Sequence, residues 1–169
     1  IGTRSGIGRF DGYEQRRYLR VNVTHILEDE EHTIWAITEK GVFRYNEKED
    51  KFTLVRDKDN NPVIASSLCL WEDGVIFGGR GSLYKYNYED HIINLFHTLK
   101  PNGKYHISNL YQWDSRTLLA TNRWAKALFI DIATGNTRPV PFNSEQIISL
   151  LIDKKGNVWV AHYNQGVSC

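Results

Sequence analysis

Four basic side chains recur along the sequence in short polar or glycine-containing segments: Arg4, Lys40, Arg80 and Arg123. An arginine guanidinium group can hold a carboxylate or a sulfate through two parallel hydrogen bonds, and a lysine adds a point charge. If the fold brings these segments together, the sequence predicts a basic rim that binds an anionic ligand such as a uronate or a sulfated sugar. The alternative is that they are solvated loop residues, because Lys and Arg are common in any loop.

Two segments of the same kind also carry aromatic, imidazole and amide side chains. Trp124 follows Arg123 directly, and His162, Tyr163 and Asn164 stand together. Flat rings offer surfaces for sugar rings, and amides offer hydrogen-bonding partners. The predicted ligand site therefore comprises Arg4, Lys40, Arg80, Arg123, Trp124, His162, Tyr163 and Asn164. The segment 102–106 is a weaker candidate on the same predicted face.

Signatures of catalysis and of phosphate or metal binding are missing from the sequence. The glycines between Gly2 and Gly8 lack the Gly-Lys-Ser/Thr of a phosphate loop, and no Gly-x-Ser-x-Gly occurs. The six His include no pair at zinc spacing, and Cys69 and Cys169 follow no metal-ligand spacing and suggest no disulfide. We therefore expect a protein that is not an enzyme and has no catalytic residues, no metal site and no cofactor.

The candidate segments recur because the chain is internally repetitive. Residues 26–42 and 150–167 share an apolar strand, a polar turn containing Asp, an apolar-Trp strand and a Gly before the next strand. Related copies lie between them, so that the repeat is anchored near positions 35, 76, 118 and 159, at spacings of 41, 42 and 41. Units of this length built from four short strands are typical of β-propeller blades, whereas a β-sandwich has no reason to repeat at this period.

The strands of the first full copy are expected at Val23–Glu28, Thr33–Thr38, Val42–Asn46 and Lys51–Arg56, with a helix content near zero in the chain. The predicted fold class is all-β: a β-propeller fragment of about four blades, each a four-stranded antiparallel sheet. Residues 1–169 then form part of one propeller domain that is incomplete at both ends. The remaining blades are expected in a longer chain.

The repeat also predicts where its own residues lie. Trp35 and Trp159 should fill the space between neighbouring blades rather than stack on a ligand, and Asp29 and Asp153 should form turns. Loops between second and third strands gather on one face of a propeller, and these loops carry the basic residues. The turns on the opposite face are acidic, as at 28–31.

The segment 148–161, followed by Gly166-Val167, resembles the two-component regulator propeller repeat, and residues 1–7 and 35–45 are further matches. The second and third copies lack the Trp and are degenerate. This resemblance implies the periplasmic sensor region of a Bacteroides-type hybrid two-component system, anchored in the inner membrane and signalling to a histidine kinase. In that family the ectodomain senses oligosaccharides.

Composition is that of an ordinary globular protein, with 41% hydrophobic and 24% charged residues, and the net charge of +1 argues against nucleic acid as a partner. No apolar run is long enough to span a membrane, and the first residues lack the features of a signal peptide. The absence of Met fits a piece of a longer protein.

The predicted function is a periplasmic ligand-sensing propeller segment that responds to an oligosaccharide, with an acidic one favoured. Its expected partners are that ligand, the remaining blades and downstream domains of the same chain, and a second copy in a homodimer. One alternative is a protein-interaction or dimerisation propeller without a small-molecule ligand. Another is a glycosidase or polysaccharide lyase, which would need paired carboxylates, or a His/Tyr pair with Arg, at the axis.

Overall fold

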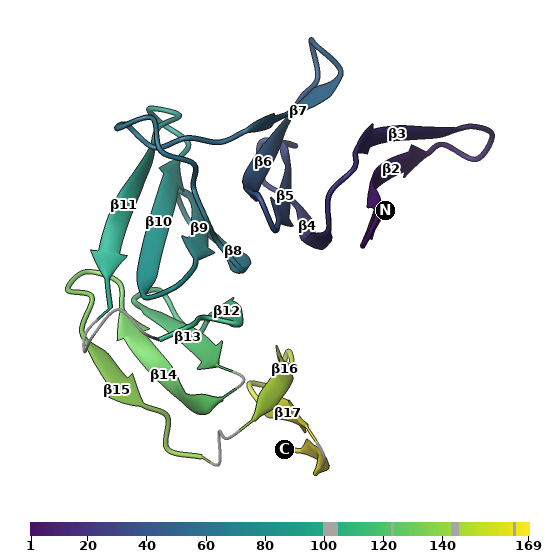
Figure 1. Cartoon of the computed structure of the whole chain (residues 1–169). Helices are drawn as coiled ribbons and strands as arrows, with labels where there is room; N and C mark the ends of the chain where they lie inside the picture. Colours follow the sequence, from purple (N-terminus) through teal and green to yellow (C-terminus); the bar gives the residue numbers. More distant parts are fainter. Residues whose placement is uncertain (100–104, 123, 143–145, 164) are drawn as a thin grey trace.

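A computed structural model of the chain describes residues 1–99, 105–122, 124–142, 146–163 and 165–169. These residues form strands and turns without any helix, arranged in five antiparallel sheets (Figure 1). The prediction of an all-β propeller fold is confirmed. In the same part of the chain, no helix is present that could cross a membrane.

Each sheet is a meander in which consecutive strands pair, and we call the sheets the first to fifth blades. The first blade contains β1 (Gly2–Thr3), β2 (Gly6–Phe10) and β3 (Gln15–Leu19). The second blade contains β4 (Val23–Glu28), β5 (Ile34–Thr38), β6 (Gly41–Asn46) and β7 (Lys51–Leu54). The third blade contains β8 (Ser67–Trp71), β9 (Gly74–Gly78), β10 (Ser82–Asn87) and β11 (Ile93–Thr98).

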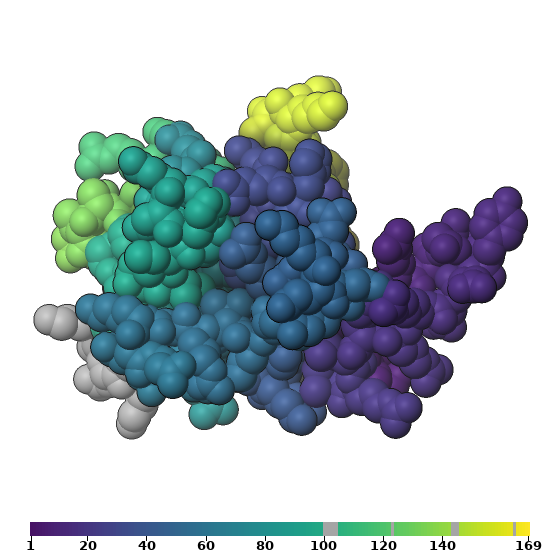
Figure 2. All heavy atoms as spheres, turned by 90° about the horizontal axis from the view of Figure 1, so that it is seen from above, coloured from purple at the N-terminus to yellow at the C-terminus, as the bar shows by residue number. Residues whose placement is uncertain are grey.

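The fourth blade contains β12 (Asn109–Gln112), β13 (Thr117–Asn122), β14 (Ala125–Asp131) and β15 (Thr137–Pro139). The fifth blade contains β16 (Ile147–Ile152), β17 (Val158–His162) and β18 (Gly166–Ser168). The blades follow one another around an arc, with the first and fifth at its two ends (Figure 1). Seen from above, the hairpin of β2 and β3 extends away from the rest of the molecule (Figure 2).

The four strands predicted for the second blade are all present, and only the last has a clearly different end. β7 ends at Leu54 instead of Arg56, because the chain leaves the sheet there. Arg56 forms an isolated bridge with Pro62, and Asp57 accepts hydrogen bonds from the amides of Asp59 and Asn61. A turn of this kind reverses the chain before it crosses to the next blade.

The core lies between the blades. Trp35 is fully buried, and its ring centroid is 5.2 Å from that of Phe77 and 4.9 Å from that of Tyr86, both in the third blade. In the third blade the fully buried Ile76 takes the same place against the fourth blade. In the fourth blade this place belongs to Leu119, next to the expected anchor at 118. Alternate strand residues face opposite sides, so Leu118 packs against the third blade instead.

The tryptophan of the fifth blade has a different environment. Trp159 is 43% exposed, because no described blade covers this side of the fifth sheet. The prediction that tryptophan fills the space between blades is therefore confirmed for Trp35 and is not met by Trp159 within the described residues.

An aspartate holds both the turn and the tryptophan of the repeat. The Asp29 carboxylate accepts hydrogen bonds from the amides of Glu31 (3.0 Å) and Thr33 (2.8 Å), and from the Trp35 indole nitrogen (2.6 Å). Asp153 does the same for the amides of Lys155 and Asn157 and for the indole of Trp159 (3.1 Å). The prediction that these aspartates form turns is confirmed, and each also fixes the ring six residues later.

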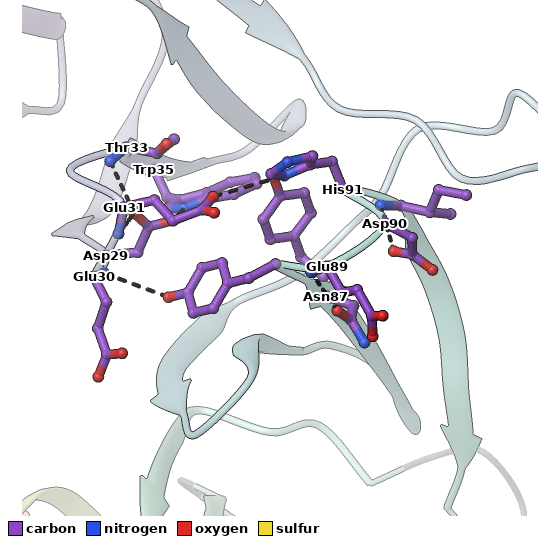
Figure 3. Close-up of polar contacts among 12 residues, drawn as sticks. Asp29, Glu30, Glu31, Thr33, Trp35, Asn87, Glu89, Asp90 and His91 are labelled. Carbon is purple, nitrogen blue, oxygen red and sulfur yellow. Dashed lines mark hydrogen bonds and ion pairs between the residues drawn. The ribbon is translucent and has the colours of Figure 1, made fainter.

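The acidic turn of the second blade contacts the third blade (Figure 3). This turn precedes β5, whereas the β5–β6 loop follows it. The amide of Glu30 donates to the Tyr88 hydroxyl (3.4 Å), and a carboxylate oxygen of Glu31 lies 3.7 Å from Nδ1 of His91. The same His91 nitrogen is 2.8 Å from the hydroxyl of Tyr86. The backbone of this turn and the Glu31 side chain thus take part in joining two blades.

Candidate functional site

The loops between second and third strands and the starts of the innermost strands converge around an open hollow of about 930 Å³. Four successive blades, from the second to the fifth, contribute to it. The described residues that line it are Thr24, His25, Ser66, Arg80, His106, Ser108, Trp124, Ile147, Ile148 and Tyr163. These side chains include one permanent cation, Arg80, and no carboxylate, so the hollow favours an anionic or neutral ligand.

Backbone pairing places Arg80 and His106 side by side. The amide of Gly81 donates to the Tyr105 carbonyl (2.7 Å), the amide of Ile107 donates to the Gly79 carbonyl (3.2 Å), and Arg80 forms an antiparallel bridge with His106. Residues directly opposite each other in such a bridge have neighbouring side chains. Both side chains are exposed, so together they can reach one anionic group.

A glycine allows this pairing. A Cβ atom added to Gly79 would lie 2.6 Å from the carbonyl oxygen of Ile64, closer than real Cβ atoms approach backbone. The β9–β10 loop can therefore pass close to the connection from the second blade only because residue 79 lacks a side chain.

Four lining residues occupy the same place in the repeat, just before or at the start of the innermost strand: Thr24, Ser66, Ser108 and Ile148. Thr24 and Ile148 are the extra residues of β-bulges. The Thr24 hydroxyl donates to the Ile37 carbonyl (3.3 Å), and the Ser66 hydroxyl donates to the carbonyls of Gly78 (3.2 Å) and Ile107. A bulge re-aims a side chain out of the sheet, which here directs it to the hollow.

His25, which follows Thr24 in β4, connects the second blade to the fourth, which is not its neighbour in the chain. Burial lowers the pKa of His25, and a hydrogen bond with the Asn109 side chain partly opposes that effect. The Asn109 amide also donates to the Thr121 hydroxyl and to the Ile148 carbonyl, both at 3.2 Å. The second, fourth and fifth blades are thus linked through polar groups next to the hollow.

One side of the hollow is apolar. Trp124 is 77% exposed, Ile148 is 51% exposed and Tyr163 is 43% exposed. The backbone amide of Trp124 donates to the Asn122 side chain (2.7 Å), and this hydrogen bond holds the β13–β14 loop. The hydroxyl of the half-buried Tyr105 donates to the carbonyls of Ala120 and Lys126 on both sides of this loop. The indole therefore stands on an anchored hairpin.

The predicted site residues are only partly brought together. Arg80, Trp124 and Tyr163 line the hollow, whereas Arg4 and Lys40 occupy the corresponding loops of the first and second blades and do not line it. His162 is buried in the fifth blade, 3.0 Å from the Ser168 hydroxyl. Arg123 and Asn164 lie outside the described residues, and from the weaker segment 102–106 only Tyr105 and His106 are described.

The innermost-strand residues Thr24, His25, Ser66, Ser108 and Ile148 were not predicted from the sequence. A signal for them exists, because a small hydroxyl residue stands at the same place in three successive copies of the repeat. Both cysteines are free thiols, Cys69 buried and Cys169 exposed. Within the described residues, no group of three or more His, Cys, Asp or Glu is arranged to hold a metal ion.

Residues 141–164 match the family model of the two component regulator propeller. No curated protein matches the sequence. Among solved structures, the chain is similar to the extracellular domain of BT3049 from B. thetaiotaomicron, which is described as a hybrid two component system. The TM-score is 0.79 at 11% identity, over 98% of this chain and 26% of that one.

A second structure, the extracellular domain of BT4673 from the same organism, gives a TM-score of 0.77 at 16% identity, over 98% of this chain and 24% of that chain. A catalytically inactive virginiamycin B lyase from Staphylococcus aureus gives 0.63 at 10% identity, over 98% of this chain and 62% of that chain. The chain thus spans about a quarter of the two extracellular domains. At these identities the likeness is one of fold, which the lyase also shares. The chain folds as a β-propeller segment, and its residues 141–164 match the two component regulator propeller model.

Proposed function

We propose that the chain is a ligand-sensing segment of an extracytoplasmic β-propeller and that its ligand, an acidic oligosaccharide, binds in the hollow between the second and fifth blades. The observation that carries this proposal is the pairing of Arg80 with His106 in a hollow that has exposed aromatic rings and no carboxylate among its described lining residues. A guanidinium group binds a carboxylate or a sulfate, and the rings of Trp124 and Tyr163 can stack on a sugar.

The extracellular domains with the same fold support an extracytoplasmic location and a sensing role. In this proposal the ligand signal passes to a histidine kinase outside the chain, and the longer protein is anchored in the inner membrane. Neither catalysis nor a cofactor is part of the proposal. A glycosidase would need two carboxylates flanking a bound sugar, and the described lining residues supply none. A lyase would need a His/Tyr pair with Arg, and Arg80, His106 and Tyr163 do line the hollow, so cleavage of a bound sugar is the outcome that would favour the enzyme alternative.

The test is a calorimetric titration of the protein with neutral and acidic oligosaccharides. One acidic sugar should bind, and Arg80→Ala should weaken its binding about tenfold to a hundredfold, the usual effect of losing a hydrogen bond to a charged group. Lys40→Ala is the matched control, because Lys40 is a cation in the corresponding loop of the second blade but does not line the hollow.

The outcomes separate the proposed site from the alternative functions. Acidic-sugar binding that survives Arg80→Ala would keep the sensor and remove this site. No binding to any sugar in the panel would favour an interaction propeller, whose contact surface would include the exposed ring of Trp124.

A further inference from the structure

One of the four equivalent positions around the hollow departs from the chemistry of the other three. Thr24, Ser66 and Ser108 carry hydroxyl groups, whereas the fifth blade has Ile148. The aliphatic side chain is 51% exposed, and the packing of the fifth blade does not depend on it. Its neighbours Ile147 (1% exposed) and Leu150 (5% exposed) form that packing.

Ile148 does not stand alone as an apolar group. Trp124 from the fourth blade and Tyr163 from the fifth line the same hollow, and each is at least 43% exposed. We call these three residues the apolar wall. Aromatic and aliphatic side chains gathered in a hollow that also carries polar side chains give a ligand a preferred orientation.

Other residues of the hollow offer hydrogen-bond acceptors. The hydroxyl hydrogens of Thr24 and Ser66 are directed to backbone carbonyls of their own and neighbouring blades. The Thr24 oxygen also lies 3.2 Å from Nδ1 of His25, so the Ser66 oxygen is the better acceptor for an N–H or O–H group of a ligand. A ligand that uses both kinds of group carries a hydrogen-bond donor with a small apolar group next to it. The acetamido group of a sugar has this combination, with an N–H donor next to a methyl group.

We infer that Ile148 is a specificity-determining residue and that the apolar wall selects saccharides with an acetamido group, whose methyl group lies against Ile148. This inference rests on the proposed function, because it assigns a saccharide to the same hollow. It adds the substituent by which one acidic saccharide is preferred over another.

The test uses two disaccharides in which glucuronic acid is joined through the same linkage to N-acetylglucosamine or to glucose, so that only the acetamido group differs. The protein should bind the acetamido form at least about fourfold more tightly, the effect of burying one methyl group. Ile148→Ser, which restores the hydroxyl of the other blades, should reduce this ratio to near one by weakening the acetamido form alone.

Ile64→Ser is the matched control, because Ile64 is an isoleucine of similar exposure, 52%, outside the hollow. It should leave the ratio unchanged, and equal thermal unfolding midpoints should show that both variants are folded. A ratio near one in the unmodified protein, or one that Ile148→Ser does not change, would overturn this inference and leave the sensor in place. If neither disaccharide nor any other sugar binds, the proposed function fails and the inference fails with it.

Discussion

At the scale of single residues, the same aspartate that shapes a turn also positions a tryptophan. The carboxylates of Asp29 and Asp153 each bind two backbone amides and one indole nitrogen. The Asp29 group is buried, and replacing it would leave a buried indole N–H without a partner, which is a costly defect. In the two copies that keep the tryptophan, the aspartate and the indole therefore act as a pair.

The exposed copy of this pair gives a testable pH dependence. Hydrogen bonds from the side chains of Asn157 and Trp159, and from backbone amides, lower the pKa of Asp153 from 3.8 to about 2. Because the folded-state value is the lower one, the ionised carboxylate stabilises the fold above pH 3.8, and this contribution is lost as the pH falls towards 2. Urea midpoints of the protein and of Asp153→Asn should therefore differ at pH 6 and converge near pH 2. An equal difference at both pH values would contradict this account.

The residues of the hollow show what the sequence can and cannot predict. Arg80, Trp124 and Tyr163 could be predicted from the sequence because they lie in loops that the repeat assigns to one face. Lys40 lies in an equivalent loop but does not line the hollow, because a period defines a loop but not the direction of its side chains. Ile148 and Thr24 were missed, since a strand pattern does not reveal the bulge that turns each one towards the hollow. The bond between Asp29 and Trp35 was also missed, although the same spacing of six residues recurs at Asp153 and Trp159.

At the scale of elements, the β9–β10 loop and the connection between β11 and β12 work as one unit. Their backbones pair through Gly79, Gly81, Tyr105 and Ile107, which fixes Arg80 beside His106. The strands themselves were predicted almost to the residue in the second blade because each is short, apolar and bounded by polar turns. This pairing between a loop and a connection joins two different blades, and no local pattern in the sequence encodes it.

Gly79→Ala tests the pairing. The added Cβ would meet the Ile64 carbonyl at 2.6 Å, so the loop must shift, and we expect a loss of about 2 kcal/mol in the free energy of unfolding. Weaker binding of acidic ligands should accompany it, because Arg80 moves with the loop. Gly8→Ala is the control, since its Cβ would approach the flexible end of the Gln15 side chain at 3.3 Å and backbone only at 3.6 Å, an ordinary contact that should be tolerated. Denaturant unfolding measures both, and equal stabilities would show that the close approach does not matter.

At the scale of the whole molecule, stability resides in the contacts between blades. The buried clusters that join the second to third, third to fourth, and fourth to fifth blades each combine side chains from two sheets. The period of the sequence predicted these layers because a residue that faces the next blade recurs in each copy. In two of the copies Ile76 and Leu119 take the place of the tryptophan, so the period persists where the residue type does not.

Two tryptophans at the same place in the repeat allow the stability contributed by contacts between blades to be measured. Trp35→Ala should lower the free energy of unfolding by about 3–5 kcal/mol, because it leaves a cavity beside Phe77 and Tyr86. Trp159→Ala should cost about 1 kcal/mol or less, since much of that ring already contacts solvent and leaves no enclosed cavity. Urea unfolding of the two variants provides the comparison, and equal losses would contradict a core located between the blades.

The hydrogen bond between each aspartate and its tryptophan lies within one hairpin, and this has a consequence for how the molecule folds. Asp29 and Trp35 belong to one hairpin, so the indole can be oriented before the third blade is present, while Phe77 and Tyr86 that cover it come later in the chain. During synthesis, the second blade would leave the ribosome with the Trp35 indole oriented but still exposed to solvent. Each later blade would then bury the exposed face of the blade before it. Folding then proceeds from the N-terminus onward, because Trp35 belongs to the earlier blade and the residues that cover it belong to the later one.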